Sequence, residues 1–254
     1  MFAVAQGFSN NNQLNYRHVG GSSTNSALTW TTFAGAPSQS NVQIQFGTSS
    51  GNFIANSAIS NTSGTFMNVG SGDFTIEAWI WLPSSHATGT TSTGDLIVNN
   101  VNNGLGIRFG NAYQSNSFKA ISLFQRNGSD GNYANVTFTA NTWTHVAAQR
   151  LGNTISFWAN GTYLGGNTTY KTAPLNAVTF ANNVSTAQTI AGYNGGEYMG
   201  TYIDELCVSK YARYRNPTAN IIVPTQPFFV DQFTTLLMHF DNGNGNTTFN
   251  NATS

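Results

Sequence analysis

The stretch that most constrains this chain is WTHVAAQRLGNTISFWANGTYLGG, residues 143–166, which predicts three antiparallel strands joined by two tight turns. Gly152 supplies the first turn, because glycine accepts positive φ without steric cost. Between the turns Ile155 and Phe157 point to one face while their neighbours point to the other, which is the period of a strand. Asn160 and Gly161 then predict a two-residue hairpin turn with two positive φ values. A chain built around such a meander needs further strands to cover it.

Short segments with the same alternation recur along the chain and are bounded by Asn, Gly or Pro. The predicted strands are residues 42–46, 73–82, 96–98, 105–109, 118–124, 133–138, 144–150, 154–159, 162–164, 190–193, 201–209 and 233–240. We expect a hairpin between 190–193 and 201–209, and one or two helical turns at 210–215. Many short strands without sustained helical periodicity predict an all-β fold, a two-sheet antiparallel β-sandwich of the jelly-roll kind.

Residues 73–82, DFTIEAWIWL, have large apolar groups on both faces. One face holds Phe74, Ile76, Ala78 and Ile80, and the other holds Thr75, Glu77, Trp79 and Trp81. We therefore expect a central strand with a layer over each side.

The chain is predicted to hold one domain. Residues 1–40 are weakly patterned and form an N-terminal arm or extension, which is either a flexible end or a segment that orders against a neighbouring subunit. Residues 41–254 form the sandwich, within which 216–254 combine an extended segment rich in proline with the final strand.

Composition excludes several classes of function. Only 7% of the 254 residues are charged, and the formal net charge is zero. Nucleic-acid binding needs clustered Lys and Arg, and a membrane span needs about 20 apolar residues, so we expect neither partner. Cys207 is the only cysteine, which excludes an internal disulfide. The low charge permits identical copies to pack closely.

Three segments in order, GDFTIEAWIWL, the 143–166 meander and GYNGGEYMGTYIDELCVSKYARY, resemble the laminin-G-like branch of the concanavalin A-like jelly rolls. The resemblance covers about residues 41–215. It implies a sandwich of about a dozen strands whose loops or concave sheet bind sugars or proteins, often with calcium. Some distant relatives are glycoside hydrolases.

IDELCVSKYARY, a Pro-rich stretch and TTLLMHFDNGNGNTTF resemble the versions of this domain found in bacteriophage virion proteins. This resemblance implies a location in the virion, with other virion proteins and identical copies as partners. In those proteins the LLxHFD strand usually precedes the domain, whereas here it comes last. It either closes this sandwich from the C-terminal side or belongs to a neighbour's fold.

The acidic residues do not predict an enzyme. A glycosidase needs two carboxylates about 5 to 10 Å apart across a cleft, and the hydrolase relatives supply them as Glu-x-Asp-x-x-Glu, which is absent here. Glu77 beside Trp79 could face a sugar, but we favour its pairing with an arginine such as Arg108 or Arg150.

Asp204 shares strand parity with Leu206 and Val208, which places a carboxylate on the apolar side. Such a group needs hydrogen bonds, a charged partner or a metal. One interpretation is calcium, bound with loop carbonyls or Asp73. We favour the other, in which Asp204 accepts hydrogen bonds from backbone N–H groups of a nearby turn and no cofactor is needed.

Tyr193, Tyr198 and Tyr202 flank the Gly195-Gly196 turn, where aromatic rings could stack on sugars or anchor a protein interface. Together with Glu77 and Trp79 they are the candidate ligand-binding residues. The first hypothesis is a non-enzymatic structural protein of a phage virion, such as a capsid decoration, fibre or tail component. The alternative is a carbohydrate-binding module that attaches a particle or cell to surface glycans.

Overall fold

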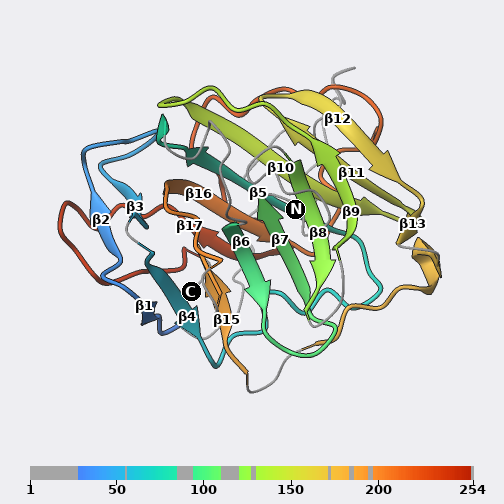
Figure 1. The fold of residues 1–254 in the computed structure, drawn as a ribbon, viewed down its shortest axis with the longest axis horizontal. Coiled ribbons are helices and arrows are strands. Elements are labelled where there is room, and N and C mark those ends of the chain that lie inside the picture. Colours follow the sequence, from blue (N-terminus) through green and yellow to red (C-terminus); the bar gives the residue numbers. More distant parts are fainter. Residues whose placement is uncertain are drawn as a thin grey trace, which may run out of the picture.

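The computed structural model describes residues 28–54, 56–84, 94–109, 120–126, 130–170, 173–182, 186–193 and 197–252. Two large antiparallel sheets stack face to face, and a single hydrophobic core with residues from both sheets lies between them (Figure 1). The predicted two-sheet β-sandwich is therefore confirmed.

The first sheet has seven strands. In spatial order they are β1 (Thr31–Ala34), β4 (Ala58–Asn61), β15 (Gln188–Ile190), β6 (Gly94–Asn99), β7 (Leu105–Phe109), β8 (Ala120–Gln125) and β9 (Asp130–Asn135). The second sheet has eight. Seven of them run in the order β12 (Thr162–Asn167), β11 (Thr154–Ala159), β10 (Trp143–Leu151), β5 (Phe74–Trp81), β16 (Tyr202–Ser209), β3 (Ser50–Asn52) and β2 (Ser38–Ser40), and β17 (Thr234–Met238) pairs with β16.

The connection before β15 contains regular structure of its own. A two-stranded ribbon of β13 (Thr169–Tyr170) and β14 (Ala173–Pro174) leads into one 3-10 turn, Leu175–Ala177. Leu175 and Phe180 are fully buried in the core, so this connection closes one part of the sandwich.

The meander and the central strand form as the sequence predicts. β10 pairs with β11 and β11 with β12, and Asn160 and Gly161 have φ values of 44° and 77°. β5 lies between β10 and β16. Its side chains Phe74, Ile76, Ala78 and Ile80 face the core. The other face of β5 is covered too, as described below, so both layers expected over this strand are present.

The C-terminal strand closes the chain's own sandwich. Two strands pair with the same edge of β16. Tyr202 and Ile203 pair with β3, and residues 206–209 pair with β17. Leu236, Met238 and Phe240 lie in the common core, as their alternation predicts. Of the two alternatives for this strand, the structure shows the first, in which it closes this sandwich from the C-terminal side.

The prediction of a strand at residues 42–46 is wrong. Residues 41–48, which we name the 41–48 loop, form bends, and Val42 and Ile44 are 67% and 37% exposed. The backbone N–H groups of Gln45 and Phe46 donate to the Asp204 carboxylate, each at 3.1 Å, instead of to a neighbouring strand. A side-chain acceptor from β16 thus replaces the expected strand ladder.

Two further local predictions are also wrong. β15 and β16 do not form a hairpin, because they belong to different sheets and the chain crosses between the layers after β15. Residues 210–215 form no helix, because their backbone donors bond to side chains on the sheet: Arg213 N–H donates to Thr75 Oγ1, and Tyr214 N–H donates to Gln149 Oε1.

Of the predicted N-terminal arm, residues 1–27 lie outside the described residues. Residues 31–34 and 38–40 are β1 and β2, which pair with β4 and β3 respectively. Across the described ranges, no helix has the length and apolar character needed to span a membrane.

Candidate functional site

The five residues predicted to bind a ligand lie on two different faces of the molecule. On the eight-stranded sheet, Glu77 and Trp79 of β5 lie on the outer face, away from the core between the two sheets. Tyr202, which pairs with Trp81, lies on the same outer face. Tyr193 and Tyr198 belong to the connection after β15, against the seven-stranded sheet. The structure therefore does not bring the five together into one site.

On the eight-stranded sheet, Glu77 is enclosed. Its side chain is 1% exposed and accepts a hydrogen bond from the Tyr214 hydroxyl. Its Oε2 lies 3.3 Å from His145 Nε2, and its Oε1 lies 3.8 Å from Arg213 Nε. Burial opposes the charge of Glu77, but His145, Arg213 and Tyr214 outweigh it and lower the pKa of this carboxyl. A carboxylate in this state is a structural anion with saturated contacts.

Glu77 does lie beside an arginine, as expected, but the two arginines suggested for it, Arg108 and Arg150, are wrong. Arg108 lies on the other sheet and pairs with Asp95. The guanidinium of Arg150 donates to the carbonyls of Leu175 and Val178. Arg213 takes their place from a segment more than 130 residues away in sequence.

That segment, residues 210–233, forms a strap across the eight-stranded sheet. Near its middle Ile221 packs with Trp158, and Trp158 Nε1 donates to the Ala219 carbonyl at 2.8 Å. Near its end Phe228 packs on Cys207 and Leu237 of β16 and β17. The strap is the second layer predicted over β5, and a ligand could reach Glu77 only by displacing it.

Two ionic contacts fasten the end of the strap. Arg213 donates to both carboxylate oxygens of Asp231, at 2.8 and 3.2 Å. Burial raises the pKa of Asp231, but Arg213, Thr234 and the N–H of Phe233 together lower it. The N–H of Phe228 donates to Glu205 Oε2 at 2.7 Å, while Glu205 Oε1 lies 2.7 Å from His239 Nδ1. The Glu205 contact raises the pKa of His239.

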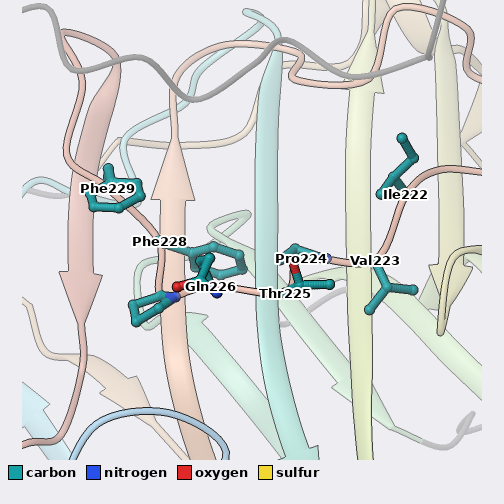
Figure 2. Close-up of a pocket in the computed structure, with 8 residues that line it drawn as sticks. Ile222, Val223, Pro224, Thr225, Gln226, Phe228 and Phe229 are labelled. Atoms are coloured by element: carbon teal, nitrogen blue, oxygen red, sulfur yellow. The ribbon is translucent and has the colours of Figure 1, made fainter.

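The outer surface of the strap holds an open cavity of about 240 Å³, lined by residues 222–229 (Figure 2). Figure 2 shows this part of the chain crossing the strands, with Ile222 and Phe229 at its two ends. These two side chains are 47% and 50% exposed. The lining is mostly apolar and holds no charged group, so the cavity has no chemistry for catalysis.

Trp79 and Tyr202 are also buried rather than presented to solvent. Trp79 is 7% exposed and packs edge-on against Phe46 and beside His145. Tyr202 is 8% exposed and meets Trp81 edge-on at 5.5 Å. Trp79 therefore helps to hold the 41–48 loop against the sheet, and Tyr202 packs along the sheet itself.

Asp204 lies on the opposite face from the one its parity predicts. It pairs with Trp79, which points outward, whereas Leu206 and Val208 point into the core. A β-bulge between Asp204 and Cys207, with Glu205 at a φ of 52°, reverses the alternation. Burial raises the pKa of Asp204 to about 8, opposed by the N–H groups of Phe46 and Gln45.

The two residues proposed for calcium are far apart. Asp204 pairs with Trp79 near one end of β5, while Asp73 precedes the other end and accepts a hydrogen bond from Gly152 N–H at 2.7 Å. Asp73 lies six residues from Trp79, and at about 3.3 Å per residue this places the two carboxylates about 20 Å apart along the strand, too far to bind one ion. No group of three or more His, Cys, Asp or Glu that could hold a metal occurs in the described part of the chain.

On the seven-stranded sheet, Tyr193 meets a cation. The Arg126 guanidinium lies 3.9 Å from the centre of the Tyr193 ring, and its Nη2 donates to the Tyr193 hydroxyl. Both side chains are half-buried. Tyr198, also half-buried, packs on Gly192, where any side chain would clash with its ring. The connection after β15 thus presents two tyrosines at the molecular surface, and Tyr193 meets Arg126, which follows β8.

Beside them a second arginine joins two carboxyl groups. Arg108 Nε donates to Asp95 Oδ1 at 2.9 Å, and its Nη2 donates to Glu197 Oε2 at 3.1 Å. The Arg108 guanidinium also lies 4.0 Å from the centre of the Phe124 ring. Glu197 is 33% exposed, whereas Asp95 is fully buried. Burial raises the pKa of Asp95 to about 8, and a hydrogen bond to Glu197 adds to the rise.

We name Tyr193, Tyr198, Arg126, Arg108, Asp95 and Glu197 the Tyr193 site. Sequence reasoning found its tyrosines but not its charged residues. A signal exists in the sequence: Arg108 interrupts an otherwise apolar strand, and in a chain so poor in charge an arginine within a strand predicts a paired carboxylate.

Comparison with known proteins identifies the family. The family model described as the concanavalin A-like lectin/glucanases superfamily, of the laminin-G type, matches residues 55–217, well over half of the chain. The chain therefore belongs to this superfamily. A search of curated proteins finds no match.

Solved structures share the fold at low sequence identity. A proposed carbohydrate-binding protein from Bacteroides ovatus is 18% identical with a TM-score of 0.54, covering 89% of this chain and 56% of its own. The enzymatically active domain of tailspike protein 2 from bacteriophage CBA120 is 12% identical with a TM-score of 0.58, covering 91% and 36%. The chain thus spans about half or less of the length of these two proteins.

Proposed function

We propose that this protein is a non-catalytic carbohydrate-binding domain and that the Tyr193 site receives the sugar. The observation that carries this proposal is the half-buried Tyr193–Arg126 pair beside the partly exposed Glu197. Sugar sites combine aromatic faces with a few fixed polar groups. The likeness to a proposed carbohydrate-binding protein over 89% of this chain supports the same conclusion.

The carboxyl groups of the site favour binding over hydrolysis. Glycosidases hold two carboxyl groups about 5 to 10 Å apart, with the scissile bond between them. Asp95 and Glu197 instead share a hydrogen bond and one guanidinium. Asp95 is fully buried, so a substrate cannot reach it without moving Glu197.

A glycan array with the purified chain, followed by calorimetry on the best ligand, tests the proposal. We expect Tyr193→Ala to lower affinity about tenfold, a loss of about 1.4 kcal/mol in binding free energy. Phe229→Ala removes a more exposed aromatic ring, on the strap over the other sheet, and should leave binding unchanged. Absence of binding to any glycan, or equal losses in both variants, would overturn the assignment. Release of reducing sugar would show a hydrolase instead.

A second candidate is a structural role in a phage virion, as a capsid decoration, fibre or tail component. The 41–48 loop exposes Val42 and Ile44 although its backbone is fastened by Asp204, and a fixed loop with exposed apolar side chains suits a protein contact. The tailspike likeness covers 91% of this chain. Identical copies or other virion proteins would be the partners.

Mass measurement in solution tests the assembly role. We expect an oligomer that Val42→Asp or Ile44→Asp dissociates, while Thr225→Asp, a charge added to the strap, does not. A monomer at all concentrations would exclude self-assembly, and virion proteins would then be the remaining partners, to be sought by binding to purified particles.

A further inference from the structure

The two arginines of the Tyr193 site differ in how their charges are balanced. Arg108 contacts the carboxyl groups of Asp95 and Glu197, and it is 9% exposed. Arg126 contacts Tyr193 through its ring and hydroxyl, and no carboxylate of the described residues lies within ion-pair distance of it. The positive charge of Arg126 is therefore not neutralised within this part of the structure.

The charges of the site add up to an excess of positive charge. Burial and the neighbouring Glu197 outweigh the attraction of Arg108 and raise the pKa of Asp95 to about 8, so Asp95 is mostly protonated at pH 7. The positive charge of Arg108 and the negative charge of Glu197 then cancel each other. Arg126 remains, and Tyr193 fixes the plane of its guanidinium, which lowers the entropy that an incoming ligand must remove.

We propose that the Tyr193 site binds acidic glycans, with Arg126 pairing with a carboxylate or sulfate group of the sugar. A guanidinium offers two parallel N–H donors to such a group, and this geometry distinguishes it from a sugar hydroxyl. The tyrosine rings then contact the apolar face of the sugar ring. The proposal rests on the proposed function, because it names the ligand class of the same site.

The test compares pairs of oligosaccharides that differ only in one carboxylate, and separately pairs that differ only in one sulfate. We expect the wild-type chain to bind the acidic member of at least one pair about tenfold more tightly, with a preference that weakens in high salt. Arg126→Gln should remove the preference while neutral binding remains. Arg126→Lys, which keeps the charge but not the planar fork, should retain only part of it.

Arg215→Gln is the matched control, because Arg215 is exposed on the other sheet. Equal affinity of the wild type for acidic and neutral members overturns the inference and leaves the proposed function intact. So does a preference that persists in Arg126→Gln or disappears in Arg215→Gln. Absence of binding to every sugar overturns the proposed function, and the ligand class with it.

Discussion

The two outer faces of this sandwich use similar side chains for different purposes. On the eight-stranded sheet, Glu77 and His145 lie beneath the strap and meet its Arg213, and all three are nearly inaccessible to solvent. On the seven-stranded sheet, Arg126 also meets an aromatic ring and Glu197 also meets an arginine, but both stay partly exposed. The difference teaches that polar and aromatic residues mark a candidate binding site only when no part of the chain already covers them.

The covered face contributes to folding. Glu77 accepts a hydrogen bond from Tyr214 and compensates Arg213, and both charged side chains are buried. Removing one partner of a buried ionic cluster leaves the others uncompensated, which costs about 3 to 5 kcal/mol. The Tyr193 site lies on the other sheet, where Glu197 and Arg126 stay partly exposed.

The largest expected effect follows from Glu77→Ala, which should lower the free energy of unfolding by about 3 to 5 kcal/mol. Urea denaturation followed by tryptophan fluorescence measures this loss. Glu77→Gln, which keeps an acceptor for Tyr214, should lose less. If Glu77→Ala left stability unchanged but abolished sugar binding, the roles that we assign to the two faces would be reversed.

The strap offers a matched pair of adjacent residues. Phe228 is 2% exposed and packs on β16 and β17, whereas Phe229 is 50% exposed. We expect Phe228→Ala to destabilise the fold by about 3 kcal/mol and Phe229→Ala to change stability by no more than about 0.5 kcal/mol. Similar losses in both variants would mean that the strap does not pack as described.

Much of the sandwich could be predicted because its information is local. Period-two alternation located β5, β10 and β11, and Asn160-Gly161 located a turn whose two positive φ values are a property of the dipeptide. The same alternation also predicted which side chains of β5 face the core. Such signals depend only on residues that are close in sequence, which is why the predictions made from them agree with the structure.

The sites could be predicted only in part, because they depend on distant partners. Glu77 meets Tyr214 across 137 residues of sequence, and no local pattern indicates which arginine or tyrosine will arrive. Alternation also failed at Asp204, where the bulge at Glu205 inserts one residue and reverses the faces. The hydrogen bonds of Asp204 to turn N–H groups were nevertheless anticipated, since a buried carboxylate requires them.

Asp204→Ala tests how the 41–48 loop is held. The variant leaves the N–H groups of Gln45 and Phe46 without their acceptor, at a cost of about 2 kcal/mol. We expect lower stability and faster proteolysis at the loop. Because Asp73 is too distant to share an ion with Asp204, a chelator should not shift the unfolding temperature of the wild type. A shift that disappears in Asp204→Ala would restore the calcium hypothesis.

The smallest expected effect concerns the pH dependence of the Tyr193 site. The pKa of Asp95 is raised to about 8 from 3.8, so the native state holds one more proton than the unfolded chain between these values. The contribution of Asp95 to stability therefore falls as pH rises from about 4 to 8, and is constant above that.

Deprotonation of Asp95 also adds a negative charge beside Arg108 and Glu197, and this charge cancels the excess positive charge of Arg126. Affinity for an acidic glycan should then fall about threefold between pH 7 and 9. In Asp95→Asn, whose side chain cannot ionise, calorimetry at the two pH values should give equal affinities. An equal fall in both proteins would show that another group titrates, and that Asp95 does not set the charge of the site.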